Sequence, residues 1–251
     1  RAAKMVCVDM DHPDIETFID WKSVEEQKVA ALVAGSKAIA YHLRAVIRAC
    51  AQGQGEEAFD VASNEALAQA VQSALAAFVP EAYIERVIEF ARQGFTDIEF
   101  PEYDCEWESE AYRTVGGQNA NNSVRVNGEF LRAVETDGEW ALIRRTDRAV
   151  AKTVRARALM DRLCRAAWAC ADPGLQYDST INEWHTCPKD GRINASNPCS
   201  EYMFLDDTAC NLASLNLLAF LNPETGEIDL EDLRHAIRIW TVVLEISVTM
   251  A

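Results

Sequence analysis

Helical periodicity covers most of residues 14–93, whereas from about residue 95 short apolar runs alternate with amphipathic stretches. Alternating strand and helix signals favour an α/β fold, because each strand buries an apolar face against a neighbouring helix. Residues 13–94 are therefore predicted to be mainly helical and residues 95–251 to be mixed α/β. The uneven spacing of the strand signals leaves the topology open.

Cap and turn residues predict several element boundaries. Pro13 suits the first position of a helix, Asn127 can cap a second helix that ends near Gly138, and Asp229 can open a third. Strands are predicted at 6–10 and 121–126, a helix at 152–171 closed by Asp-Pro-Gly, and helix breaks near Gly35, at 53–55, at Pro80 and at Gly94.

Composition and charge exclude several classes of protein. The 251 residues are 49% hydrophobic and carry 24 basic against 40 acidic side chains, a net charge of −16. This balance argues against a nucleic-acid binder, which needs clustered cations to neutralise phosphates. Lys37, Arg44 and Arg48 interrupt the most apolar stretch, so neither a membrane-spanning helix nor membrane association is expected.

The chain begins at Arg1 rather than Met, without a leader pattern, and ends while an amphipathic pattern still runs, so truncation at both ends is predicted. Eight cysteines without a C-x-x-C pair indicate reduced thiols in the cytoplasm rather than a disulfide framework. Cys50, Cys164 and Cys170 are expected to be core residues.

The densest cluster of reactive side chains lies in and just after the long polar segment 175–205. Asn197, Cys199 and Glu201 occupy alternate positions, so in an extended stretch all three would face one side. A thiol can carry a hydrogen atom, a carboxylate can accept a proton and an amide can orient a hydroxyl. No histidine lies within five residues of Cys199, which weakens a Cys–His nucleophile. The alternative is a polar loop around a structural cysteine.

Metal binding is not expected. His185 and Cys187 could join Cys199 and Cys210 in a zinc site, but structural zinc sites normally show two short ligand pairs and only one is present. A second group of acids is more simply explained by the dipole at a helix start; its members are Asp9, Asp11, Asp14 and Glu16.

Longer strings carry a more specific signal. The runs ADPGLQYD at 171–178, INEWHTCP at 181–188 and NPCSE at 197–201 resemble class II ribonucleotide reductases, the adenosylcobalamin-dependent type. The runs GQNANNSVRV at 117–126 and DDTACNLASLNL at 206–217 do so too. The resemblance is in order and covers nearly the whole chain.

The resemblance implies a role for each residue of the cluster. Cys199 matches the cysteine that becomes a thiyl radical and abstracts the ribose 3′ hydrogen. Glu201 matches the carboxylate that takes the 3′-hydroxyl proton, and Asn197 the amide that binds the ribose hydroxyls. Cys210 matches one of two thiols that reduce the 2′ position and end as a disulfide, its partner lying upstream of this chain.

The implied fold is part of the ten-stranded α/β barrel of ribonucleotide reductases, with Cys199 on a finger loop. Residues 1–251 would be a partial catalytic barrel domain. Arg1 and Lys4 would lie at the end of a loop between an effector site and the substrate base. Adenosylcobalamin is the implied cofactor, and the implied partners are ribonucleoside di- or triphosphates, dNTP or ATP effectors, a thioredoxin-type reductant and, in the full-length protein, a second copy in a homodimer.

Two other hypotheses stay open. A class I large subunit would use the same thiols but receive its radical from a separate metal-containing subunit. A non-catalytic regulatory or assembly protein would keep only this part of the barrel. Activity with added adenosylcobalamin distinguishes the first, and the sequence of the whole parent protein distinguishes the second.

Overall fold

The computed structural model describes residues 4–250, which divide after Thr180 into two compact units. The first unit holds every strand of the two sheets together with seven helical segments, and its mixed α/β content confirms the predicted class. Within residues 4–250 the strands do not close into a barrel: they form one three-stranded sheet and one two-stranded sheet.

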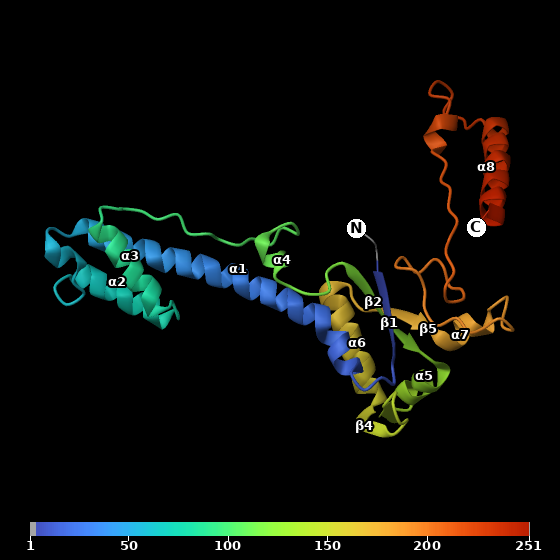
Figure 1. The fold of residues 1–251 in the computed structure, drawn as a ribbon, viewed down its shortest axis with the longest axis horizontal. Helices are drawn as coiled ribbons and strands as arrows, with labels where there is room; N and C mark the ends of the chain where they lie inside the picture. Colours follow the sequence, from blue (N-terminus) through green and yellow to red (C-terminus); the bar gives the residue numbers. More distant parts are fainter. Residues whose placement is uncertain (1–3, 251) are drawn as a thin grey trace. The chain divides into compact units, whose positions relative to one another are not determined.

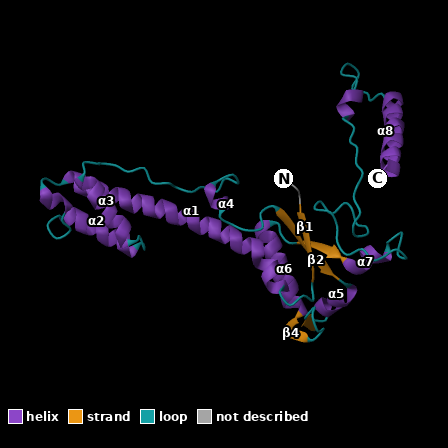
Figure 2. Ribbon diagram, viewed as in Figure 1, coloured by secondary structure: helices purple, strands orange, loops and turns teal. Residues whose placement is uncertain are grey.

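The larger sheet is parallel, in the order β1-β2-β5, and Figure 2 shows its strands in orange. Its strands are β1 (Lys4–Asp9), β2 (Ala120–Val126) and β5 (Gly174–Tyr177). The central strand β2 buries five consecutive residues, as expected for a parallel strand covered on both faces. The predicted strands at 6–10 and 121–126 are thereby confirmed to within two residues.

A buried ion pair lies in this sheet. Arg125 on β2 has a side chain only 2% exposed, and its guanidinium donates to Asp178 Oδ1 from Nε at 3.1 Å and from Nη2 at 2.6 Å. Arg125 Nη1 also donates to Gln176 Oε1 on β5 at 2.9 Å. These bonds connect the central strand to its neighbour through side chains as well as backbone.

The smaller sheet is an antiparallel hairpin of β3 (Glu139–Ile143) and β4 (Val150–Arg155). The helix predicted at 152–171 therefore begins later than expected, as α6 (Ala156–Cys170). Residues 152–155 are drawn into a strand because they pair with β3, a contact that local periodicity does not register.

Helices α1 (Ile15–Gln52), α5 (Gly128–Glu135) and α6 pack around the parallel sheet and the hairpin. Their shared core has Phe130 in edge contact with Trp140, the ring centroids 5.1 Å apart. The fully buried members of this core include Ile15, Ile19, Val124, Val126, Phe130, Leu142 and Ala156.

The C-terminal half of α1 extends away from the sheet and carries α2 (Glu65–Ala76) and α3 (Glu81–Arg92), as Figure 1 shows. We call these three helical segments the helical arm, and they share a second core. The helix break predicted near Gly35 is wrong, since α1 runs through it. One interior glycine costs only about 1 kcal/mol, which burial on both sides of it offsets. The breaks at Gly53 and Pro80 are confirmed.

By length and composition α1 could cross a membrane, with a mean hydropathy of 1.2 in its most apolar window. Its apolar side chains, however, already contribute to all three hydrophobic clusters described in this chain. Part of its apolar face packs against α2, α3 and α6, and 33% of that window is buried inside the structure.

Side-chain caps explain where two helices begin. Asn64 Oδ1 accepts from the Leu67 amide at 3.1 Å at the start of α2. Asn127 Oδ1 accepts from the Phe130 amide at 2.8 Å, so the predicted cap of α5 is confirmed. By contrast Pro13 lies before the first helix, whose described start is Ile15 with Asp14 at the cap position.

Replacing Asn127 by alanine should loosen α5, because the Phe130 amide loses its acceptor, at a cost of about 1 kcal/mol. In the full-length protein, hydrogen exchange of the first α5 amides should accelerate about fivefold. Asn127→Asp, which keeps an acceptor oxygen, is the matched control. Equal exchange in the alanine variant and the parent would contradict a stabilising cap.

The predicted explanation of the acids near the first helix is incomplete. Asp9 and Asp11 both pair with Arg145 from the β3–β4 connection, the first at 3.3 Å. Glu16 pairs with Arg162 of α6 at 2.9 Å and with Lys152 of β4. These carboxylates therefore tie the start of α1 to the hairpin and α6, in addition to any interaction with the helix dipole.

The three cysteines expected in the core differ in how deeply they are buried. Cys50 is buried, as predicted, and burial raises the pKa of its thiol. Cys170 is half-buried; burial raises its thiol pKa, and the thiol donates to Ala166 O and Asp172 O at 3.3 Å. Cys164 is exposed on α6, so its assignment to the core was wrong.

The second unit, residues 181–250 as described, contains little regular structure. Helix α7 (Asp178–Glu183) spans the boundary, a short 3-10 turn η2 occupies Leu217–Phe220, and α8 (Leu230–Met250) is the last helix. Asp229 Oδ1 accepts from the Glu231 and Asp232 amides, each at 3.0 Å, which confirms it as the opening residue of α8.

Candidate functional site

The NPCSE motif forms a tight turn in the second unit. The Ser200 amide donates to Asn197 O at 3.0 Å, and Ser200 has a φ of 61°. The predicted extended conformation is therefore wrong, because a residue in the left-handed region reverses the chain. The alternate-position argument does not apply to a turn, and Cys199 instead lies exposed within it.

Asn197 holds this turn closed. Its Oδ1 accepts from the Tyr202 amide at 3.0 Å, while the Asn197 amide donates to Tyr202 O at 3.3 Å. This hydrogen bond fixes which end of the side-chain amide is the oxygen. The Nδ2 group makes no hydrogen bond within residues 4–250, so it can donate to a ligand.

A cavity of about 410 Å³ lies beside the turn. Both Asn197 and Cys210 line it, together with Tyr202, Asp206 and Thr208. The structure thus brings two of the four predicted catalytic residues to one cavity. Cys199 and Glu201 are exposed and do not line it in this conformation.

Side-chain hydrogen bonds brace the loop in place of regular structure. Asn182 bonds both backbone groups of Ile193, its Nδ2 donating at 3.1 Å and its Oδ1 accepting at 3.0 Å. Asn194 Nδ2 donates to Asp206 Oδ2 at 2.8 Å. Tyr202 OH bonds Thr208 Oγ1 at 3.0 Å. The sequence interpretation did not single out Asn182 or Tyr202, and an excess of amide and hydroxyl side chains in 182–208 was the only available signal.

His185 is buried, and its ring packs within the loop while its Nε2 has no hydrogen-bond partner among the described residues. Its ring makes an edge contact with Phe204, the centroids 5.7 Å apart, and its Nδ1 accepts from the Cys187 amide at 3.4 Å. Among the described residues no group of three or more His, Cys, Asp or Glu side chains is arranged to hold a metal ion. In the same range the Cys199 thiol has no hydrogen bond to a histidine.

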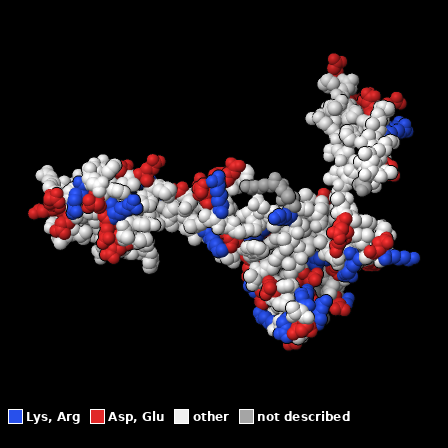
Figure 3. All heavy atoms as spheres, in the orientation of Figure 1, with Lys and Arg blue, Asp and Glu red and all other residues white. Residues whose placement is uncertain are grey.

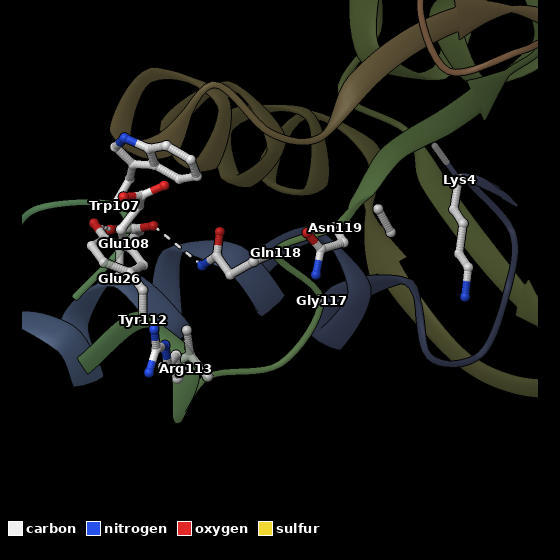
Figure 4. A pocket seen from close by; sticks show the side chains of 11 residues that line it. Lys4, Glu26, Trp107, Glu108, Tyr112, Arg113, Gly117, Gln118 and Asn119 are labelled. Carbon is white, nitrogen blue, oxygen red and sulfur yellow. Dashed lines mark hydrogen bonds between the residues drawn. The ribbon is translucent and has the colours of Figure 1, made fainter. Parts of the chain in front are cut away.

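Lys4 lines a separate cavity of about 1390 Å³ in the first unit, shown in Figure 4. Glu26 also lines this cavity. Its carboxylate accepts hydrogen bonds from Tyr112 OH at 2.8 Å and from Gln118 Nε2 at 3.4 Å. The hydrogen bond to Glu26, with a smaller effect of burial, raises the pKa of Tyr112. Lys4 was predicted to lie at the end of a loop, but it is the first residue of strand β1 and pairs with Ala120. Arg1, the other predicted cation, lies outside the described residues.

Acidic and basic side chains are interspersed on the face drawn in Figure 3, with no broad basic surface. A polar loop braced by side chains and bearing an exposed thiol, in a chain whose first unit is α/β with a parallel sheet, indicates an enzyme that uses cysteine chemistry. The class indicated is therefore a thiol-dependent enzyme.

Comparison with known proteins specifies the family. The chain matches the model of the ribonucleotide reductase barrel domain over residues 1–251, and it belongs to that family. Relatives named vitamin B12-dependent ribonucleotide reductase occur in Agrobacterium fabrum, at 59% identity over 253 residues, and in Bradyrhizobium diazoefficiens, at 60%. A relative of the same name in Rhodopirellula baltica is 48% identical.

Each of these alignments covers the whole of this chain. The chain in turn spans 20% of the Agrobacterium and Bradyrhizobium proteins and 18% of the Rhodopirellula protein. It thus corresponds to about a fifth of the length of such relatives.

Proposed function

We propose that the protein carrying this chain reduces ribonucleotides to 2′-deoxyribonucleotides for DNA synthesis in the cytoplasm, with adenosylcobalamin as cofactor. The supporting observation is that the barrel-family match and the alignments to B12-dependent relatives both span the thiol-bearing turn. Residues 1–251 would form part of the catalytic barrel, with 197–201 on its finger loop.

The residues present fit the cofactor's chemistry at one point. When bound, adenosylcobalamin supplies a carbon radical that removes a hydrogen atom from a thiol. Such a thiol must be reachable from outside its own loop, and Cys199 is exposed on its turn. Among residues 4–250 no histidine contacts the Cys199 thiol, which also suits a one-electron role better than thiolate attack.

The proposed roles follow from the chemistry of each side chain. Cys199, as a thiyl radical, takes the hydrogen from ribose C3′, and Glu201 accepts the 3′-hydroxyl proton. Asn197 donates from Nδ2 to a ribose hydroxyl, its other amide end being held by Tyr202. The 2′-hydroxyl leaves as water, and Cys210 and an upstream thiol supply two electrons and two protons and join as a disulfide. The hydrogen held by Cys199 then returns to C3′.

Lys4 is proposed to approach a nucleotide phosphate, which its position at the edge of a large cavity supports. Arg1 is proposed to act beside it. Effectors of the dNTP or ATP type, a thioredoxin-type reductant and a homodimer of the full-length chain complete the proposal.

Activity of the full-length protein should require adenosylcobalamin and no second, radical-generating subunit. With a ribonucleoside diphosphate or triphosphate and a dithiol reductant, product should form on adding the cofactor and fall to background without it. Product formation that instead requires a second metal-containing subunit would favour a class I large subunit. No product under either condition would favour a non-catalytic protein.

A further inference from the structure

A cationic face on the helical arm contains none of the residues assigned to ribonucleotide reduction. Lys37, Tyr41, Arg44 and Arg48 follow one another at spacings of four, three and four residues along α1. This spacing places them on one face of the helix. The same four side chains, with Ala45 and Glu102, line a cavity of about 520 Å³.

The opposite face of this part of α1 is fixed in the helical core, where Val46 and Cys50 are buried. The cationic face is therefore held in position. In contrast to the chain's net charge of −16, the cavity has three cations and one carboxylate. A local positive site on an acidic protein indicates a small anionic ligand, since a long polyanion would meet repulsion from the surroundings.

Only one of the three cations forms an ion pair with a carboxylate among residues 4–250. Arg44 Nη1 pairs with Glu102 Oε1 at 2.7 Å. Lys37 and Arg48 are exposed, and no carboxylate among residues 4–250 lies within ion-pair distance of either. They are thus free to bind phosphate groups, with Arg44 between them.

Tyr41 supplies the second recognition element. Its side chain is 70% exposed, although a large aromatic ring gains by burial. The ring of His42 stands edge-on to it, with centroids 5.2 Å apart, and His42 Nδ1 lies 3.5 Å from Ser73 Oγ of α2. The ring is oriented by these neighbours, and its remaining surface can stack on a planar base.

We propose that this cavity binds a nucleoside polyphosphate, with the phosphates on Lys37, Arg44 and Arg48 and the base on Tyr41. The volume suits a ligand of that size, since small-molecule sites usually span about 300–1,000 Å³. The proposal goes beyond the proposed reaction, because the site uses none of its residues and binding is measured without turnover.

The test is photolabelling of the full-length protein with 8-azido-ATP, followed by mass spectrometry of the peptide that contains Tyr41. This peptide separates the site from any other nucleotide site in the protein. Labelling should saturate with rising probe and be competed by ATP. Inorganic tripolyphosphate should need at least about tenfold higher concentration, because it lacks a base to stack.

Single substitutions test how each charged side chain affects binding of the probe. Lys37→Ala and Arg48→Ala should each raise the half-saturating probe concentration about fivefold, whereas Glu102→Gln should lower it about fivefold. Arg86→Ala, an exposed arginine on α3, should leave it unchanged.

Each opposite outcome overturns the assignment. Absence of label on the Tyr41 peptide, or the same half-saturation in the parent and both cation variants, would show that the face is not a phosphate site. Equal competition by tripolyphosphate and ATP would show that no base is recognised.

Discussion

Replacing Cys199 by serine in the full-length protein should lower deoxyribonucleotide formation by at least about 10⁴-fold, as removal of a central catalytic group does. The O–H bond of serine is too strong for an alcohol to replace a thiol as a hydrogen-atom carrier. Product should be measured by chromatography after incubation with adenosylcobalamin, substrate and a dithiol reductant.

Nucleotide binding by the serine variant should be retained, since the two side chains are similar in size and Cys199 is exposed on its turn. Cys105→Ser, at another exposed cysteine, is the matched control and should keep full activity. Turnover by Cys199→Ser above background would remove Cys199 from its proposed role.

Replacing Cys210 by serine should block turnover at a later step. Radical formation on Cys199 should persist, because Cys210 is not the hydrogen carrier, but one of the two electrons for C2′ would be missing. Electron paramagnetic resonance should therefore still detect a radical, while product should be reduced at least about a hundredfold.

The parent protein provides the complementary measurement. After a single turnover without added reductant, mass spectrometry should find Cys210 in a disulfide with a cysteine upstream of this chain. Cys164, exposed on α6, serves as an internal control and should stay free. A free Cys210 after turnover would contradict the reducing role.

Local signals predicted the elements whose determinants are local. Asn127 caps α5 and Asp229 opens α8 because each contact reaches only two or three residues along the chain. The start of α6 was missed because residues 152–155 pair with β3, which is a contact between segments. Gly35 was overestimated as a helix breaker for the same reason, since packing along α1 outweighs its low helix propensity.

The candidate site was predictable in its residue types but not in its geometry. The motif at 197–201 identified an amide, a thiol and a carboxylate, but nothing local signalled the left-handed Ser200 that turns the chain. The cavity shared by Asn197 and Cys210 depends on bonds such as Asn194 to Asp206, which span the loop. Such pairings depend on the folded chain rather than on spacing.

The buried guanidinium of Arg125 has a consequence for how the parallel sheet assembles. Because side chains alternate between faces, a one-residue slip of β5 along β2 would carry Gln176 to the opposite face and draw Asp178 out of reach. Breaking a buried ion pair costs about 3–5 kcal/mol. A slipped register would thus be less stable than the native one, and the native register determines where the polar segment that follows β5 leaves the sheet.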